Sequence, residues 1–337
     1  MTSKNDRKSA KWTVGITDFF EPPADIEQKA FPEAQFCFLS DWKRSKKTKE
    51  IWREVDALLI WRWNTDRATI ELLNNCKIAV RYGVGFDNVD VEALDERNII
   101  FCNNPGCSTT EVADTTSAMI LSLQRKIVEY DRRCRTDTGK WQKTLPPIQR
   151  TSEQTLGIIG AGRIGKAVLD RMKSFGYRIL VYDPYLSQQD QKDESYELVN
   201  SIPEMLRESD IITIHTPLTE KTRGMVNAEF FSQMKEGSSF VNNARGNILK
   251  DLDCLYEALK NGHLVSAAMD VLPDEPPKDH PLIQDWKKDA PWLSGRLLIN
   301  PHVADYSERM AYDMRFKAAE TLRLYFIKGK LRNRIKP

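Results

Sequence analysis

The chain has 337 residues, a length that favours two domains. It is 41% hydrophobic and 29% charged with a net charge of +2, so its composition gives no case for binding nucleic acid or a membrane surface. No apolar run approaches the roughly 20 residues that span a bilayer, and the N-terminus lacks a signal-peptide core, so we expect a cytoplasmic protein. The six cysteines form no CxxC pair and no histidine lies at zinc-ligand spacing from them, which predicts free thiols and no metal site.

Short apolar runs alternate with helical stretches along the chain and fall into two series. The runs do not alternate with polar residues, which is typical of strands buried on both faces of a parallel sheet. This alternation of strand and helix predicts α/β domains. Strands are predicted at 12–17, 35–40, 56–61, 77–83 and 98–103 in the first series, and at 155–160, 178–183, 210–216, 238–243, 266–271 and 296–301 in the second.

Helical periodicity accounts for most of the sequence between these strands. A long helix is predicted at 109–134, between the two series, and a polar stretch with two prolines at 136–152 predicts a loop. Further helices are predicted at 67–75, 166–177, 202–209, 228–237, 253–263 and 307–329.

A glycine-rich loop follows the first strand of the second series. Gly160, Gly162 and Gly165 fit G-x-G-x-x-G, and a helical stretch follows them. Such glycines make a tight turn, let a pyrophosphate approach the backbone and let the helix pack on the strand. Asp183 ends the next strand, 23 residues after Gly160, where a carboxylate binds ribose hydroxyls and repels a 2′-phosphate. The pattern predicts NAD rather than NADP.

Three chemistry-bearing residues follow consecutive strands of the second series. Arg245 comes after the fourth strand, Glu275 after the fifth and His302 after the sixth. Singly, each has a structural reading as a rim arginine, a loop glutamate or a capping histidine. Parallel strands end at one edge, so together they predict a site for reducing a 2-keto acid. The positive charge of Arg245 would hold the carboxylate of the keto acid, and His302 would donate a proton to its ketone oxygen.

The other three histidines suggest less. His215 ends the third strand of the second series, in a loop suited to lining the cofactor. His263 and His280 lie in polar sequence and are expected to be solvated.

The chain resembles the D-isomer-specific 2-hydroxyacid dehydrogenases. Within that family, the stretches EVADTT and HVADYSE are most similar to the C-terminal-binding-protein branch, which includes transcriptional corepressors as well as enzymes. The matching stretches follow the family's order, at 81–90, 103–106, 111–116, 157–168, 215–222, 242–246, 269–277 and 300–302.

The resemblance implies an α/β fold of two Rossmann- or flavodoxin-like doubly wound domains with a cleft between them. The substrate domain would be discontinuous, formed by residues 1–108 plus 304–337, and residues 109–303 would bind NAD. The resemblance also implies a homodimer through the cofactor domain, with the contact expected at the helix 109–134 and the loop 146–150.

The resemblance assigns roles as well. Arg245 would hold the substrate's carboxylate and carbonyl, His302 would exchange the proton, and Glu275 would favour the protonated imidazole. The substrate would also meet Val84 and Gly85, through their backbone amides, and the charge of Arg81. The cofactor would be bound by Gly160, Gly162, Arg163, Ile164, Gly165, Asp183, His215, Thr216, Pro217, Thr222, Ala244 and Asp270.

Two stretches depart from the family pattern. Arg62, between Trp61 and Trp63, could bind a second anion on the substrate, or the tryptophans could pack while the arginine is solvated. Asp305 could contact a hydroxyl or amine on a polar 2-keto acid, or it could cap the last helix, for which Ser307 is equally suited.

The sequence therefore predicts an NAD-dependent D-2-hydroxyacid dehydrogenase whose partner is a small 2-keto or 2-hydroxy acid. Two alternatives stay open. One is an NAD(H)-sensing, corepressor-like binding protein with weak dehydrogenase activity. The other is a short-form 3-phosphoglycerate dehydrogenase, short because no extra C-terminal regulatory domain is expected.

Overall fold

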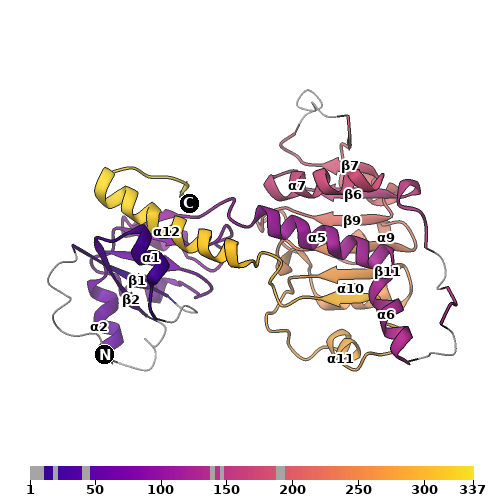
Figure 1. Ribbon diagram of the computed structural model, residues 1–337, viewed down its shortest axis with the longest axis horizontal. Coiled ribbons are helices and arrows are strands. Elements are labelled where there is room, and N and C mark those ends of the chain that lie inside the picture. The colour runs from indigo at the N-terminus through magenta and orange to yellow at the C-terminus, as the bar shows by residue number, and fades with distance from the viewer. Residues whose placement is uncertain (1–10, 18–21, 40–45, 137–140, 145–147, 187–193) are drawn as a thin grey trace. The chain divides into compact units, whose positions relative to one another are not determined.

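The computed structural model describes residues 11–17, 22–39, 46–136, 141–144, 148–186 and 194–337 (Figure 1). The chain divides into two compact units. Unit 1 comprises residues 1–108 and 307–337, and unit 2 comprises residues 109–306. No helix in the described part of the chain has the length and apolar character needed to cross a membrane.

Unit 1 is built on a six-stranded sheet in the order β13-β5-β4-β3-β1-β2. Strands β1 to β5 are parallel, and β13 pairs antiparallel with β5. The order 2-1-3-4-5 of the first five strands is the flavodoxin-like order of doubly wound sheets. The strands are β1 (Trp12–Ile16), β2 (Ala34–Phe38), β3 (Ala57–Ile60), β4 (Ile78–Arg81), β5 (Ile100–Cys102) and β13 (Arg334–Ile335).

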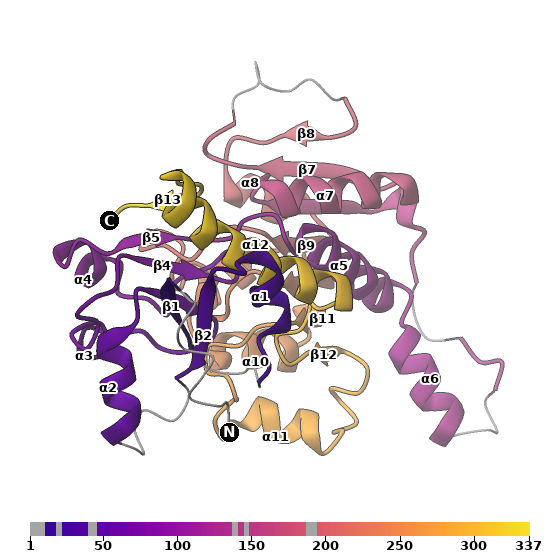
Figure 2. The same cartoon turned by 60° about the vertical axis from the view of Figure 1, so that its left-hand side comes forward.

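Helices cover both faces of this sheet. On one face α1 (Asp25–Ala30) packs along α12 (Glu308–Lys328), as Figures 1 and 2 show, around a core that includes Phe31 and Tyr82. The other face buries Trp52 and Leu94 with neighbouring apolar residues. Those residues come from the helices α2 (Lys46–Glu54), α3 (Arg67–Ile70) and α4 (Val91–Glu96) and from adjoining loops.

Unit 2 is built on a seven-stranded parallel sheet in the order β12-β11-β10-β9-β6-β7-β8. Counted from β6, this is the order 3-2-1-4-5-6 of dinucleotide-binding sheets with one further strand, and the order reverses between β6 and β9. The strands are β6 (Thr155–Ile159), β7 (Arg178–Tyr182), β8 (Glu197–Leu198), β9 (Ile211–Ile214), β10 (Ser238–Asn242), β11 (Leu264–Met269) and β12 (Leu297–Ile299).

The helices of unit 2 form a layer on each face of the sheet. α5 (Thr109–Gln124) packs along α7 (Arg163–Met172) on one face. The other face carries α8 (Ile202–Glu208), α9 (Ala228–Gln233), α10 (Leu252–Lys260) and α11 (Pro281–Lys287). α6 (Ile127–Thr136) follows α5 along the chain (Figure 1). None of its side chains is fully buried. The predicted fold class of two doubly wound α/β domains, the first one discontinuous, is confirmed.

The long helix predicted at 109–134 is wrong in one respect, because it is two helices. Lys126 has a φ of 52°, in the left-handed region that ends a helix. Glycine usually marks such a position, and no glycine flags this break in the sequence.

The helix predicted at 67–75 is also shorter than expected. It ends at Ile70, because Leu72 and Leu73 bond the carbonyls three residues before them, which gives tight turns instead of a helix. Strands β8 and β13, with two residues each, are too short to give a periodic signal. The predicted loop 136–152 lies partly outside the described residues, as does the predicted contact loop 146–150.

Candidate active site

Three neighbouring strands of unit 2 carry the residues that the sequence singled out. β10, β11 and β12 are parallel and adjacent, so their carboxyl ends lie at one edge of the sheet. Arg245 follows β10, Glu275 follows β11 and His302 follows β12. Each of these three strands is therefore followed by one of the three residues at the same edge of the sheet.

Glu275 and His302 contact each other directly. Glu275 Oε2 lies 2.7 Å from His302 Nδ1, and both side chains are about one-third exposed, 37% and 36% respectively. Glu275 Oε1 accepts a hydrogen bond of 2.9 Å from the amide of Leu272, which fixes the carboxylate within its own loop. A carboxylate on Nδ1 leaves Nε2 as the ring nitrogen able to face a ligand.

The backbone around Arg245 is fixed by its neighbour Asn242. The Asn242 side chain accepts from the amide of Ala244 at 3.0 Å and donates to the carbonyl of Arg245 at 3.0 Å. Arg245 Nη1 donates to the carbonyl of Ala244 at 2.7 Å. A Cβ at Gly246 would overlap the carbonyl of Leu272, so this glycine lets the Arg245 loop lie against the loop of Glu275.

The turn that carries His302 is held by Asp270, the first residue after β11. His302 has a φ of 57°, and its amide donates to the Asp270 carbonyl at 2.8 Å. The Asp270 carboxylate accepts from the amides of Val303 and Ala304 at 2.9 and 3.0 Å. Burial raises the pKa of this carboxyl, while the two amides and His302 oppose the rise.

The glycine loop follows β6, beside the reversal of strand order. Gly160 has a φ of 96°, and a Cβ there would lie 2.9 Å from the backbone of His215, which follows β9. A Cβ at Gly165 would overlap the carbonyl of Gly160, so this glycine lets α7 pack against the turn. A Cβ at Gly162 would meet no atom of the described residues within 4 Å. Space therefore lies beside the N-terminus of a ten-residue helix, where a pyrophosphate binds in such folds.

Asp183 lies at the end of β7, next to this loop. Its Oδ2 accepts from the amide of Ala161 at 2.8 Å and its Oδ1 accepts from the amide of Tyr185 at 2.9 Å. The carboxylate is thus fixed at the edge of the glycine turn, and a carboxylate has further lone pairs for a ligand's hydroxyls.

Two polar atoms after β9 are shielded from solvent and have no hydrogen-bond partner among the described residues. They are His215 Nδ1 and Thr216 Oγ1. Burial lowers the pKa of His215 to about 4, and its Nε2 lies 3.1 Å from Thr213 Oγ1. Shielded polar groups without partners beside a glycine turn fit a site that a dinucleotide would complete.

The remaining predicted cofactor residues surround the same turn or the strand end beside it. Thr222 Oγ1 donates to the carbonyl of Pro217 at 2.7 Å, which closes the loop after His215. At the start of α7, Arg163 is exposed and Ile164 is half-buried, and Ala244 is half-buried before Arg245. No group of three described metal-ligating side chains is placed to hold a metal ion.

The predicted substrate residues Arg62, Arg81, Val84 and Gly85 belong to unit 1. The guanidinium carbons of Arg81 and Arg62 lie 4.9 and 5.8 Å from the ring centroid of Trp61. Arg62 follows β3 and Arg81 ends β4. These strands are parallel neighbours, so both arginines lie at the carboxyl edge of the sheet, where ligands bind in such folds. Arg62 is exposed, Val84 is 41% exposed, and Arg81 and Gly85 are half-buried.

The structure decides which residue caps the last helix. Ser307 Oγ accepts from the amide of Met310 at 2.9 Å, so Ser307 is the N-cap of α12 and Asp305 is not. Asp305 is half-buried, and its charge contributes to the raised pKa of Asp270.

His263 and His280, expected to be solvated, are half-buried, and each has a protein partner. His263 Nε2 lies 2.9 Å from the carbonyl of Met234, and His280 caps α11 by accepting from the amide of Leu282.

Sequence reasoning missed two contacts from α5. Thr115 Oγ1 donates to the carbonyl of Ala304 at 3.2 Å, and Thr116 Oγ1 accepts from Asn243 Nδ2 at 3.0 Å. Both threonines lie in the stretch 111–116 that carried part of the family resemblance. These contacts could not be predicted from the sequence, because the partner residues lie more than 100 positions away along the chain.

Known proteins resemble this chain in sequence and in structure. The family model for the NAD-binding domain of D-isomer specific 2-hydroxyacid dehydrogenases matches residues 117–304. A glyoxylate reductase of Korarchaeum cryptofilum is 35% identical over 271 residues, which are 79% of this chain and 77% of the relative. A D-3-phosphoglycerate dehydrogenase of Methanocaldococcus jannaschii is 41% identical over 217 residues, which are 64% of this chain and 41% of that relative. The matched segment thus spans less than half of that protein's length.

The fold is shared with solved structures. A D-lactate dehydrogenase of Aquifex aeolicus, in complex with NAD and lactic acid, superposes with a TM-score of 0.80 over 96% of this chain and 99% of its own. Its sequence is 24% identical, so this likeness concerns the fold. With the matched family model and the glyoxylate reductase relative, the assignment follows: the chain belongs to the D-isomer specific 2-hydroxyacid dehydrogenase family and carries that family's NAD-binding domain.

Proposed function

We propose that the protein is an NAD-dependent oxidoreductase that interconverts a 2-keto acid and a D-2-hydroxy acid. One observation carries the proposal. The 2.7 Å contact between His302 and Glu275 lies on the strand edge that also carries Arg245 and, farther along the sheet, the glycine loop.

The roles follow from the chemistry of the side chains. Bound NADH would supply the hydride to the keto carbon. Arg245 would bind the substrate's carboxylate with a planar, permanently charged fork. His302 would donate the Nε2 proton to the keto oxygen in reduction and take it back in oxidation, with Glu275 balancing the charge of the imidazolium. The glycine loop and Asp183 would hold the pyrophosphate and ribose of the cofactor.

Residues of unit 1 and Asp305 would also contact the substrate. We propose that the amides of Val84 and Gly85 bind the carboxylate and that Arg81 adds charge. Arg62 would bind a second anion if the substrate has one, whereas Asp305 would favour a hydroxyl or amine. A polar 2-keto acid fits these groups better than an apolar one does.

A phosphorylated 2-hydroxy acid is the second candidate substrate. Two guanidinium groups against one indole ring, Arg81 and Arg62 against Trp61, suit a dianion. The relative with 41% identity is a D-3-phosphoglycerate dehydrogenase, which supports this candidate.

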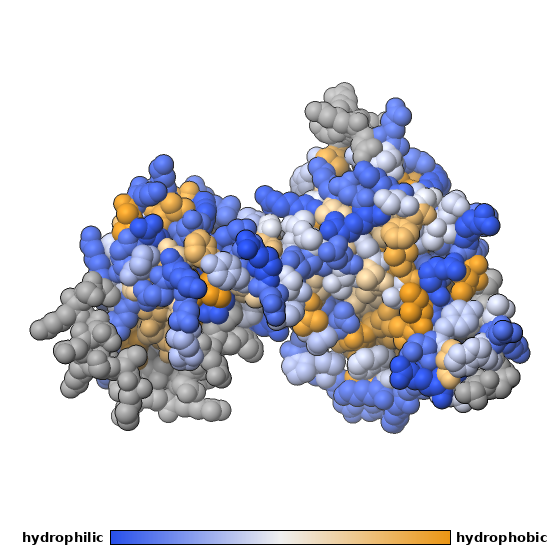
Figure 3. All heavy atoms as spheres, in the orientation of Figure 1, coloured by the Kyte–Doolittle hydropathy of each residue, from blue (hydrophilic) through white to orange (hydrophobic). Residues whose placement is uncertain are grey.

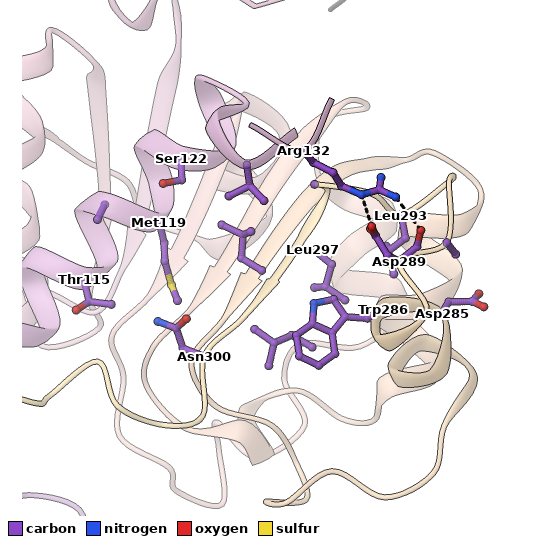
Figure 4. A pocket seen from close by; sticks show the side chains of 16 residues that line it. Thr115, Met119, Ser122, Arg132, Asp285, Trp286, Asp289, Leu293, Leu297 and Asn300 are labelled. Atoms are coloured by element: carbon purple, nitrogen blue, oxygen red, sulfur yellow. Dashed lines mark hydrogen bonds and ion pairs between the residues drawn. The ribbon is translucent and has the colours of Figure 1, made fainter. Parts of the chain in front are cut away.

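We also infer that two copies pair through the face of unit 2 formed by α5, α6 and β12. A groove of about 450 Å³ lies there, lined by apolar residues including Met119 and Leu293 and closed at one end by the ion pair of Arg132 with Asp289 (Figure 4). Apolar side chains gather on this face (Figure 3), and Ile127 is 54% exposed. A second copy would present the same surface, and twofold symmetry would let each copy cover the groove of the other.

The corepressor-like alternative and a cytoplasmic location remain predictions. Because a sensing protein need not turn over fast, catalytic efficiency distinguishes it from an enzyme. The test is NADH oxidation, with NADPH alongside, on a panel of glyoxylate, hydroxypyruvate, 3-phosphohydroxypyruvate, pyruvate, and branched and aromatic 2-keto acids. We expect turnover of at least one compound that is lost in Arg245→Ala and His302→Ala but kept in Asp274→Asn, which removes an exposed carboxylate next to Glu275. Tight NADH binding without turnover of any compound would contradict the enzyme assignment.

A further inference from the structure

The residue proposed as the acid–base has an unusual backbone conformation. His302 has a φ of 57°, a region that residues other than glycine adopt uncommonly. Such a conformation costs energy and persists only where the surroundings hold it in place. The contacts of residues 302–304 therefore identify what holds the imidazole.

Asp270 supplies most of these contacts. Its carbonyl accepts from the amide of His302 at 2.8 Å. Its Oδ1 accepts from the amides of Val303 and Ala304, and its Oδ2 lies 3.1 Å from the amide of Ala304. One residue thus binds three consecutive amides of the turn.

The carboxylate that makes these bonds is buried. Asp270 is 3% exposed, and burial raises its pKa above the ordinary value. A folded-state pKa above the unfolded value means that ionising this carboxyl lowers folding stability relative to its protonated form, and that this loss is relieved as the pH falls through the folded-state pKa. The amides of Val303 and Ala304 offset part of the loss.

We propose that Asp270 is a positioning residue, which holds the turn 302–304 so that the imidazole of His302 is fixed between Glu275 and the substrate. This inference rests on the proposed function and differs from the role that the family resemblance implies for Asp270, which is binding of the cofactor. The carboxylate is engaged by the amides of the turn, and it acts through His302.

Thr115 holds the far end of the same turn. Its hydroxyl on α5 donates to the carbonyl of Ala304 at 3.2 Å, and Ala304 is 2% exposed. The turn is therefore fixed through its amides by Asp270 and through its last carbonyl by α5.

Two substitutions at Asp270 separate the hydrogen bonds from the charge. Asp270→Asn can keep an oxygen at the position of Oδ1, which alone accepts from both Val303 and Ala304. Asp270→Ala removes all of the side-chain bonds. We expect Asp270→Ala to lower kcat by about 10- to 100-fold, with the KM for NADH changed by less than about 2-fold. Asp270→Asn should retain kcat within about 5-fold.

Hydrogen exchange gives a readout that needs no turnover. The amides of Val303 and Ala304 should exchange faster in Asp270→Ala and remain protected in Asp270→Asn. If the wild-type protein reduces no 2-keto acid, the proposed function fails, while the exchange rates still decide whether Asp270 holds the turn. Unchanged exchange in Asp270→Ala would overturn the proposal.

The kinetic outcomes decide the role. A wild-type kcat in Asp270→Ala overturns the proposal. An equal loss in both variants with a raised KM for NADH also overturns it and assigns Asp270 to the cofactor. If Asp270→Ala does not fold, Thr115 provides the test. Thr115→Val should lower kcat several-fold at an unchanged KM for NADH, and Thr115→Ser should restore it. An unchanged kcat in Thr115→Val then counts against the proposal.

Discussion

His302 Nδ1 and Glu275 Oε2 lie 2.7 Å apart, although 27 residues separate them in the sequence. The carboxylate fixes the orientation of the ring and balances the charge of a protonated imidazole. Glu275→Gln keeps the shape and loses the charge. We expect kcat/KM for reduction to fall by about 100-fold, measured by NADH oxidation. Asp274→Asn is the matched control, and an equal loss in that variant would contradict the assignment.

Asp183 should set the choice of cofactor. Asp183→Asn leaves an acceptor for the amides of Ala161 or Tyr185 but removes the charge that repels a 2′-phosphate. We expect the preference for NADH over NADPH to fall by about 10-fold or more, measured as the ratio of kcat/KM values. Asp170→Asn, which removes a more exposed carboxylate on α7, should leave the ratio unchanged. An unaltered preference in Asp183→Asn would show that other groups exclude NADPH.

His215 should make the fold sensitive to acid. Burial holds its folded-state pKa at about 4, below the ordinary value of 6.5, so the unfolded chain binds the proton more readily between those values. Stability is therefore lost as the pH falls from 6.5 to 4. His215→Gln should remove about 2–3 kcal/mol of this loss, measured by urea unfolding at several pH values. An identical pH dependence in the variant would show that His215 does not contribute.

The exposed face of α6 should control assembly. Val128 of α6 lines the groove and is 39% exposed. If a second copy covers the groove, Val128→Glu would bury a charge in the contact. We expect the dimer to dissociate, measured as a halved mass in sedimentation velocity. Phe175→Glu places a charge at another exposed apolar residue and should leave the mass unchanged. A dimer that persists in Val128→Glu would place the contact elsewhere.

The buried pair of Glu27 and Arg315 should matter for folding. Glu27 is fully buried, Arg315 bonds both of its oxygens at 2.6 Å, and the hydroxyl of Tyr82 donates to it at 2.9 Å. Arg315→Met removes the main positive partner of a buried carboxylate and should lower the free energy of unfolding by about 3 kcal/mol, measured by urea unfolding.

Arg323→Met is the control for that measurement, because it breaks a more exposed pair, in which Arg323 likewise bonds both oxygens of Glu33, at 2.9 and 2.8 Å, and it should change stability little. If both variants lose the same stability, burial does not set the strength of these pairs.

The sequence alone determined the features that depend on neighbouring residues. Apolar runs located eleven strands of the two sheets, because residues buried on both faces must be apolar along the whole run. The spacing of Gly160, Gly162 and Gly165 with Asp183 predicted NAD, because the turn, the helix and the acid all lie within one strand–helix–strand segment. Arg245, Glu275 and His302 could be grouped because the ends of parallel strands meet at one edge.

Tertiary structure decided the features that depend on distant residues. The hydrogen bonds of Asp270 to the turn after β12, and of Thr115 to Ala304, join segments 33 and 189 residues apart, so no local pattern could reveal them. Both Asp305 and Ser307 were suitable helix caps, and only the path of the chain into α12 selected Ser307. The break at Lys126 has no glycine to mark it. Local chemistry therefore specified the strands and the motif, and long-range packing specified how the side chains around His302 are held.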